Sequence, residues 1–340
     1  MEDPGLEKRV KQDFQKSLFV KIDLFKEYST KRLIELIDKA RSCYANDDTL
    51  HMNDEDFVNM LLLDGCFILE FLEKYSKNEV ADDGFMKVEG NVVQTLIDMT
   101  LLENQIPFFV LFELFKLKHQ LILRPCRNNN NNKDNAGLLQ DLIVLVRKCI
   151  ATRVPKLTPS NVKAARDYKP LPKHLVEVVH NLCIPRKAIC GRYRECNDYG
   201  GIIEKMNSAA VLEEEGVGFK KIGKVYERYF EEKEGVKTFN ATDRTTLFDL
   251  DFSNWVLRIP SFKIDNHTET FLANMIAYEQ HSTEAAVWFS DYVSIMNQLI
   301  KSTEDVNMLC RSKRNHRQLH GFKRGGHSNV LQSVSKCQYL

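Results

Sequence analysis

Asp64 is the most unusual ionisable residue of the sequence, because it lies inside an apolar helical pattern. Apolar residues stand three, four and seven positions to either side of it, namely Phe57, Met60, Leu61, Phe67, Ile68 and Phe71. Burying an unpaired carboxylate is costly, so this side chain must be hydrogen-bonded, paired with a cation or protonated. A carboxyl group with a raised pKa could act as a general acid or base. No nucleophile or second motif accompanies Asp64, so a structural carboxylate that bridges helices is the favoured interpretation.

Three consecutive polar residues, Glu103, Asn104 and Gln105, interrupt an apolar stretch just before Pro107. Proline is favoured at the first position of a helix, where its missing N–H is not needed. The pattern therefore predicts a break at the polar residues and a new helix from Pro107. At such a junction we expect the three side chains to satisfy backbone groups that the helix ends leave without partners. An enzyme that uses Asp64 and Glu103 as buried carboxylates is the alternative function.

His180, Cys183, Cys190 and Cys196 have the residue types of a zinc site. Their spacing, H-x2-C-x6-C-x5-C, lacks the paired short spacings of zinc fingers, so we expect no bound metal. The glycines between 191 and 223 form neither a dinucleotide-binding nor a phosphate-binding loop, and the sequence contains no GxSxG or HExxH motif. We therefore expect no cofactor and assign no catalytic residue.

The C-terminal stretch from Val306 to Leu340 contains no acidic residue and seven lysines and arginines. Six of these cations are Arg311, Lys313, Arg314, Arg317, Lys323 and Arg324. Such a stretch could make weak contact with an anionic membrane surface, or it could be a solvated, disordered tail. The only aromatic residue among these cations is Phe322, so the stretch lacks the stacking platform of a single-strand binder. We expect no nucleic-acid partner.

Helical periodicity predicts the elements that carry these residues. The expected helices span residues 10–45, 55–75, 89–103, 107–121, 137–152, 171–182, 202–215, 268–280 and 285–300. Between 217 and 264 the pattern changes to short segments rich in β-forming and aromatic residues, which predict two to four strands. Pro260 places the last strand at an edge or at a bulge. The sequence thus predicts a mainly α fold, with a multi-helix bundle-like architecture and a small β element.

The chain of 340 residues has 48 lysines and arginines against 47 acidic residues, a net charge of +1. Its 43% hydrophobic and 28% charged residues are typical of globular proteins and exclude bulk disorder. The charge balance excludes a wholly basic nucleic-acid binder. Four prolines between residues 154 and 172 indicate a linker. We predict an N-terminal helical lobe at 1–152, a linker at 153–172, a C-terminal lobe with short strands at 173–305 and a basic, disordered tail at 306–340.

Cysteine usage and hydropathy indicate the compartment. The nine cysteines are an odd number and include no CxxC pair, which suits a reducing environment. The first residues have neither the basic nor the apolar region of a secretory signal. The densest apolar stretches, 60–72 and 106–117, contain charged residues and are shorter than the ~20 residues of a membrane-spanning helix. The sequence as given therefore predicts a soluble, cytoplasmic protein.

Several long stretches of the sequence resemble one family. They are MLLLDGCFILEFL at Met60–Leu72, DMTLLENQIPFFVLFELF at Asp98–Phe115, NSAAVLEEEGVGFKK at Asn207–Lys221, LRIPSFKIDNHTETFLANMIAYEQ at Leu257–Gln280 and VSIMNQLIKSTEDVNML at Val293–Leu309. The chain is similar over roughly Lys31 to Leu309 to the plant domain of unknown function family number 247. The resemblance makes family signature positions of Asp64, Gly65, Glu103, Asn104, Gln105, Pro107, Pro260 and Glu279.

The resemblance implies a mostly helical fold with a small β element, and a plant origin. Members of this family typically end in a single membrane-spanning helix, and some sit at self-incompatibility loci of grasses, where a recognition role is inferred. No catalytic activity is implied. The chain departs from the family at both ends, because it lacks the N-terminal Ile-Tyr-Arg-Val-Pro-like and Gly-Pro-Phe/Tyr-His-His motifs and has a basic tail in place of the membrane helix. The sequence therefore favours a non-enzymatic protein in recognition or signalling, whose protein partners the sequence does not name.

Overall fold

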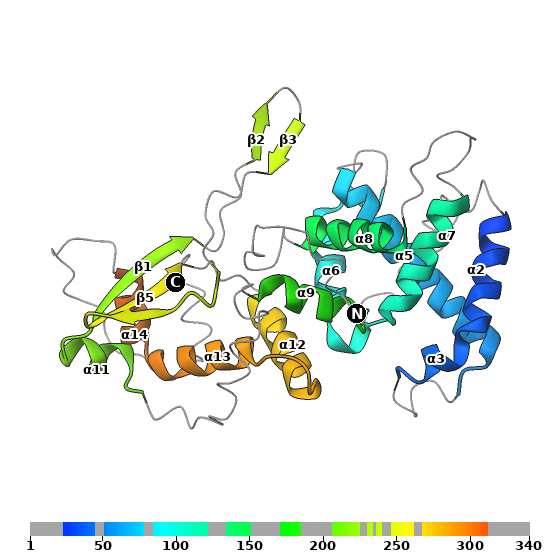
Figure 1. Ribbon diagram of the computed structural model, residues 1–340. Coiled ribbons are helices and arrows are strands. Elements are labelled where there is room, and N and C mark those ends of the chain that lie inside the picture. Colours follow the sequence, from blue (N-terminus) through cyan, green and yellow to red (C-terminus); the bar gives the residue numbers. More distant parts are fainter. Residues whose placement is uncertain are drawn as a thin grey trace. The chain divides into compact units, whose positions relative to one another are not determined.

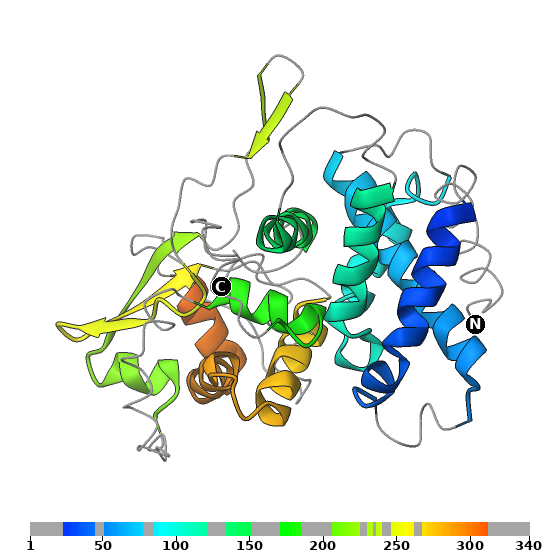
Figure 2. The same ribbon diagram turned by 45° about the vertical axis from the view of Figure 1, so that its right-hand side comes forward.

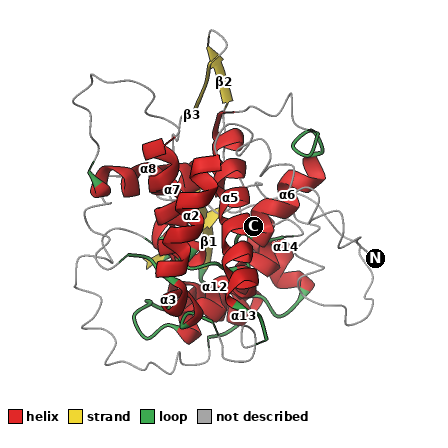
Figure 3. Ribbon diagram, turned by 90° about the vertical axis from the view of Figure 1, so that its right-hand side faces the viewer, coloured by secondary structure: helices red, strands yellow, loops and turns green. Residues whose placement is uncertain are grey.

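The computed structural model describes residues 23–44, 51–77, 84–121, 134–150, 171–184, 206–224, 230–233, 236–239, 246–261 and 267–311. The chain divides into two compact units. Unit 1 comprises Met1–Arg153 and Asn161–Val179, and unit 2 comprises Val154–Ser160 and His180–Leu340. Helix is the dominant element in both units, as Figure 3 shows, so the predicted mainly α fold with a small β element is confirmed.

Unit 1 is built from helices (Figure 1). They are α2 (Asp23–Glu35), α3 (Ile37–Arg41), α5 (Asp54–Lys77), α6 (Glu89–Asp98), the 3-10 turn η1 (Leu102–Asn104), α7 (Phe108–Leu121), α8 (Asn135–Ile150) and the first residues of α9 (Leu175–Cys183). The start of α5 shows why they form where they do. The Asn53 side chain accepts a hydrogen bond from the Asp56 N–H at 2.8 Å, and three acidic residues fill the first turn.

The core of unit 1 lies between α2, α5 and α7, and α8 packs against the last two. Its largest fully buried side chains include Phe25, Phe57, Phe71 and Phe108. Gly65 is where α5 and α7 approach closely, because a Cβ atom there would lie 2.4 Å from Cδ1 of Leu114. Leu114 is itself fully buried. The glycine at this family signature position therefore makes room for α7.

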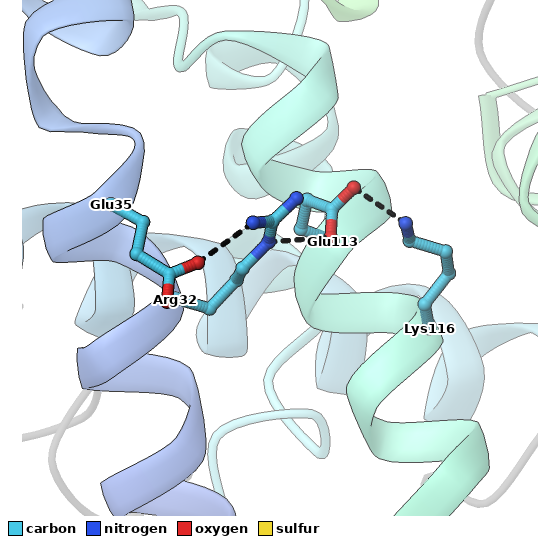
Figure 4. Close-up of polar contacts among 4 residues, drawn as sticks. All are labelled: Arg32, Glu35, Glu113 and Lys116. Atoms are coloured by element: carbon cyan, nitrogen blue, oxygen red, sulfur yellow. Dashed lines mark hydrogen bonds and ion pairs between the residues drawn. The ribbon is translucent and has the colours of Figure 1, made fainter.

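Charged side chains tie the same three helices together. Lys118 of α7 is 5% exposed and pairs with Glu73 at 2.9 Å and with Glu70 at 3.3 Å, both on α5. Arg32 of α2 donates to Glu113 of α7 at 3.1 Å, and Figure 4 shows that Glu35 and Lys116 complete this network. In the sequence, Glu70, Glu113 and Lys116 interrupt apolar stretches. In the structure they form ion pairs, either within one helix or with a neighbouring helix.

Unit 2 combines helices with a small sheet. It contains the end of α9, α11 (Ala209–Glu214), β1 (Gly218–Lys224), β2 (Phe230–Lys233), β3 (Val236–Phe239), β4 (Asp251–Ser253), β5 (Val256–Ser261), α12 (Thr268–His281), α13 (Trp288–Leu299) and α14 (Thr303–Arg311). The sheet order is β1-β5-β4, with β1 parallel and β4 antiparallel to β5, while β2 and β3 form a separate antiparallel pair. A buried cluster lies on one face of the sheet. Its residues come from α11, β5, α13 and α14 and from the position that follows α13: Ala209, Ile259, Leu299, Ile300, Val306 and Leu309.

The structure corrects several predicted boundaries. The described part of the predicted helix 10–45 is interrupted at Leu36, between α2 and α3, and α6 ends at Asp98 instead of residue 103. Helix α14 crosses the predicted start of the tail at 306, because Val306 and Leu309 are 2% and 4% exposed and belong to the core of unit 2. The residues of the predicted linker up to 170 lie outside the described part of the chain.

Pro260 lies in the central strand of the sheet, so the predicted edge position is wrong for the strand as a whole. The predicted bulge is found beside it, because the register of β1 against β5 shifts between Ile222 and Lys224, opposite Pro260 and Ser261. Strand β4 pairs only as far as Arg258, so at Pro260 the strand has β1 as its one described neighbour. A proline is tolerated at such a place because it removes no ladder hydrogen bond.

Candidate functional site

The predicted junction at Glu103-Asn104-Gln105 holds the chain turn between α6 and α7. The Gln105 amide donates to the backbone carbonyls of Leu101 at 2.6 Å and Met99 at 3.0 Å, and its oxygen accepts from the Val176 N–H of α9 at 3.2 Å. Asn104 donates to the Asp98 carbonyl at 3.2 Å. These two amides thus satisfy backbone groups at the helix ends, as expected from the sequence.

Pro107 is buried immediately before α7. The next residue, Phe108, donates its N–H to the Lys173 carbonyl at 2.8 Å, and Pro107 accepts from the Val110 N–H at 2.9 Å. Glu103, by contrast, is exposed, so the expectation of a buried carboxylate at this position is wrong.

Asp64 is half-buried and not in the centre of the buried face of α5. Of the predicted apolar stripe, Phe57, Leu61 and Phe71 are buried, whereas Met60, Phe67 and Ile68 are only partly buried. The buried face of α5 also includes Val58, Leu62, Gly65, Cys66, Leu69 and Leu72, so it is centred to one side of Asp64. The negative charge of Asp64 reaches Tyr44, where it adds to the effect of burial and raises the pKa of the phenol. Asp64 therefore lies at the margin of the core, close to the segment that follows α3.

Glu279 is a buried carboxylate, with a side chain that is 0% exposed. Its Oε1 atom accepts from Nε2 of His180 at 2.9 Å and from the Phe289 N–H at 2.8 Å. Its Oε2 atom accepts from the Ser290 N–H at 2.8 Å and from the Ser290 hydroxyl at 2.7 Å. Phe289 and Ser290 are in the first turn of α13, so Glu279 caps that helix from α12.

Asp305, which is not among the predicted site residues, plays a similar part. Its Oδ1 atom accepts from the Ala210 N–H of α11 at 2.8 Å, and its Oδ2 atom accepts from the Ser302 N–H at 2.8 Å. The Asp305 N–H donates back to the Ser302 hydroxyl at 3.2 Å, which completes a capping box at the start of α14. Burial raises the pKa of this carboxyl group, but the hydrogen bonds outweigh burial and lower the pKa below its usual range. The Ser-x-x-Asp spacing was the signal available in the sequence.

Two predicted sets of residues can be followed only in part. Of the four zinc-type residues, His180 lies in α9 one turn before Cys183, and both are buried, while Cys190 and Cys196 lie outside the described residues. Within the described ranges no group of three metal-ligating side chains occurs. The predicted anionic-surface residues Lys313, Arg314, Arg317, Lys323 and Arg324 lie outside the described ranges, and Arg311 ends α14.

The β4–β5 hairpin presents an exposed aromatic surface, and its residues are not among the predicted site residues. Phe252 of β4 is 59% exposed, and Trp255 in the turn is 70% exposed. Across the sheet Phe252 is paired with Leu257, which is paired with Phe219, so these residues form one row. Phe219 and Leu257 pack against the buried cluster of unit 2. Phe252 continues their row onto β4, the edge strand of the sheet. Figures 1 and 2 show the tip of this hairpin next to α11.

The turn of this hairpin holds Trp255 in an unfavourable backbone conformation. Asn254 and Trp255 have φ values of 53° and 58°, the left-handed values of a two-residue type I′ turn. Asparagine tolerates this region, but a bulky residue there costs roughly 1–2 kcal/mol, and glycine is the usual second residue. A strained and exposed tryptophan stabilises neither the turn nor the core. Backbone strain of this kind is often found at functional sites.

Comparisons with known proteins place the chain in a family. The family model described as a plant protein of unknown function, domain of unknown function number 247, matches residues 8–319. Two relatives from Arabidopsis thaliana, UPF0481 protein At3g47200 and the putative UPF0481 protein At3g02645, are each 23% identical to the chain. The matches cover 86% and 83% of this chain but 56% and 64% of the relatives, so the chain spans less than two thirds of either one. No solved structure matches the chain.

The family model covers most of the chain and includes every signature position named above, from Asp64 to Glu279. The described part of the protein has the helical fold with a small β element that the resemblance implied. Among the described helices none combines the length and apolar character that crossing a bilayer requires. The chain belongs to the plant domain of unknown function family number 247.

Proposed function

We propose that the chain is a non-enzymatic interaction component, active in recognition or signalling, that binds a protein partner through the hairpin tip formed by Phe252 and Trp255. The observation that carries this proposal is the exposure of Trp255, 70%, in a left-handed turn. Tryptophan is the residue type most enriched at the energetic centres of protein interfaces. Exposed large apolar side chains on a sheet edge otherwise favour aggregation, so the tip needs a partner that covers it.

The polar residues of the candidate sites support a binding role. Glu279, Asp305 and Gln105 each form hydrogen bonds to backbone groups at helix ends, and Glu279 also accepts from the His180 ring and the Ser290 hydroxyl. The alternative, an enzyme that uses Asp64 and Glu103, has a weaker basis, because Glu103 is exposed and Asp64 lies at the margin of the core. An Asp64→Asn variant tests this alternative, since the amide largely keeps the hydrogen bonding and cannot transfer a proton.

The proposal is tested by affinity capture from plant tissue with the full chain and with Trp255→Ala. The matched control is Ile34→Ala, which removes a 56% exposed apolar side chain from α2. We expect a set of proteins that the wild type and Ile34→Ala retain and that Trp255→Ala loses. Capture that is the same for all three proteins would refute a role for the hairpin.

Weak attachment to a membrane surface is part of the proposal. The cations from Arg311 to Arg324 could each contribute about 1 kcal/mol near an anionic leaflet, and salt weakens this attraction. A fluorescent fusion of the chain should therefore be mainly cytosolic, and high salt should release any membrane fraction. A fusion that stays in membranes through salt and alkaline washes would contradict this part of the proposal.

A further inference from the structure

We infer that the open edge of β4 binds an extended partner segment in which basic and apolar residues alternate. This inference rests on the proposed function and names the partner class for the same hairpin. Strand β4 is at the edge of the sheet, and within the described residues no strand pairs with its other side. An edge strand offers unpaired N–H and C=O groups to an added strand.

The hairpin register shows which backbone groups face the open edge. Ser253 and Val256 flank the two-residue turn and are partners, and Phe252 is opposite Leu257. In such a hairpin the residues next to the turn bond to each other, so the N–H and C=O of Phe252 point away from β5. A partner strand along β4 would therefore pair with the backbone of Phe252 and lie beside its side chain.

The side chains of the edge explain why the partner should alternate. Neighbouring residues of a strand point to opposite faces, so Asp251 and Phe252 lie on opposite faces of the sheet. Phe252 continues the apolar row on the face that the helices cover, and its ring is 59% exposed. The side chain of Asp251 is 56% exposed, and Asp249 just before the strand is exposed as well. An added strand places its apolar residues beside Phe252 and its other residues beside the carboxylates.

The charges at the edge of β4 indicate that the partner segment should be positively charged. Natural edge strands are commonly protected by lysine, whereas this one carries Asp251 and an exposed phenylalanine and follows the exposed Asp249. Arg258 donates to Asp251 at 3.0 Å and to the Ser253 carbonyl at 3.3 Å, so this cation is already engaged within the hairpin. Near the tip, Gly218 donates its N–H to the Trp255 carbonyl at 2.7 Å, and the exposed residues Glu213, Glu214 and Glu215 precede it in the chain.

Asp251 and Arg258 neutralise each other, and Lys220 of β1 is an exposed cation, so the acidic excess around the aromatic centre comes from Asp249 and Glu213–Glu215. Like charges across an interface are unfavourable, so an acidic segment or an anionic membrane is a poor partner for this surface. A basic, apolar segment gains from both features. Trp255 then covers the end of the added strand that lies nearest the turn.

The test uses a phage-displayed library of random 12-residue peptides, selected on the full chain and counter-selected on Phe252→Ala. We expect the enriched peptides to alternate Lys or Arg with apolar residues. Fluorescence anisotropy with the best synthetic peptide should show affinity weakened about tenfold or more by Phe252→Ala. Asp249→Asn, which keeps an oxygen for the Thr246 N–H, should weaken it about twofold to fivefold. Val287→Ala, which changes a 44% exposed apolar residue elsewhere in unit 2, should leave the affinity unchanged.

Three outcomes would overturn the inference. Enrichment of neutral or acidic peptides, or no enrichment, would remove the stated chemistry. Binding of the chain to vesicles of phosphatidylserine and phosphatidylcholine, lost on Trp255→Ala, would make the tip a lipid-binding site. A concentration-dependent dimer that Phe252→Ala dissolves would make a second copy of the chain the occupant. If tissue capture still depends on Trp255 while the peptide result is negative, the proposed function stands and this inference alone fails.

Discussion

Replacing Glu279 by glutamine is the sharpest test of how unit 2 is held together. The carboxylate accepts four hydrogen bonds, two on each oxygen, from His180, Phe289 and Ser290. Glutamine has nearly the same size, but one of its two terminal atoms is a donor. Whichever way the amide is turned, its NH2 group faces two donors, and one of them is a backbone N–H of the first turn of α13.

The expected loss of stability follows from the amide orientation that breaks the fewest hydrogen bonds. The amide can turn its NH2 group toward the Ser290 hydroxyl, which then accepts, and the Ser290 N–H loses its partner. A buried unpaired N–H costs about 1–3 kcal/mol, and the remaining bonds also lose the strength that the negative charge provides. We therefore expect Glu279→Gln to lower the free energy of unfolding of unit 2 by about 3 kcal/mol, a large part of the stability of an ordinary domain.

The assay should report on unit 2 alone, because a chain of two units need not unfold in one step. Trp288, the first residue of α13, is the natural probe once Trp255 is replaced by phenylalanine, which leaves a single tryptophan. Urea unfolding followed by Trp288 fluorescence gives the midpoint and slope. The control is Glu269→Gln, an exposed glutamate on the same helix, which should change stability by less than about 0.5 kcal/mol. If both variants lose the same small amount, Glu279 is not the cap that the hydrogen bonds indicate.

Three further predictions concern unit 1. Gly65→Ala should lower the free energy of unfolding by about 1 kcal/mol, because overpacking of ~1–3 kcal/mol against Leu114 exceeds the ~1 kcal/mol that alanine gains in a helix. Gly90→Ala is the control and should raise the stability by up to about 1 kcal/mol, because no atom lies within 4 Å of the added Cβ. Denaturant midpoints compare the two variants. Phe112→Ala should cost about 3–5 kcal/mol because the side chain is 5% exposed in α7, and a loss below about 1 kcal/mol in urea unfolding would show that this helix is not central. The Nδ1 atom of His174 accepts the Glu177 N–H at the start of α9, and burial together with Lys173 lowers the pKa of this imidazole to about 4. The folded state therefore favours neutral His174. Its contribution to the free energy of unfolding should be full above pH ~6.5 and fall by up to about 3 kcal/mol as the pH drops toward ~4. Unfolding at a series of pH values checks this, and His174→Asn, which can still cap the helix, should flatten the profile.

The helical elements could be predicted because their signals are local. Asn53 before an acidic first turn, Pro107 before an apolar stripe and the polar triplet Glu103-Asn104-Gln105 each carry their meaning within a few residues. The predicted helices 55–75 and 107–121 therefore match α5 and α7 closely. The capping amides at the junction were predicted for the same reason, since helix ends always leave backbone groups that need partners.

The rest could not be predicted because it depends on distant partners. Whether Asp64 or Glu103 is buried depends on the rotation of α5 and on the path of η1, and a one-residue change in a helical stripe moves a side chain by 100° around the axis. The pairing of Lys118 with Glu70 joins residues 48 positions apart, and that of His180 with Glu279 joins residues 99 apart. Two to four strands were predicted between 217 and 264, and the described residues of this segment form five. Strands as short as β4, with three residues, carry too little pattern for their number and bounds to be predicted.

Glu279 and Asp305 show a common solution to one structural problem of unit 2. A helix that begins in the interior has N–H groups that water cannot reach, and the positive end of its dipole favours an anion there. In both cases the anion comes from a different helix: Glu279 of α12 reaches the start of α13, and Asp305 of α14 reaches the start of α11. Each carboxylate thereby fixes the angle between two helices as well as the start of one. The buried acids Glu279 and Asp305 are thus explained by the geometry of helix starts before any catalytic role is needed. The exposed aromatic tip at Trp255 has no such structural explanation, and the proposed partner binding rests on it.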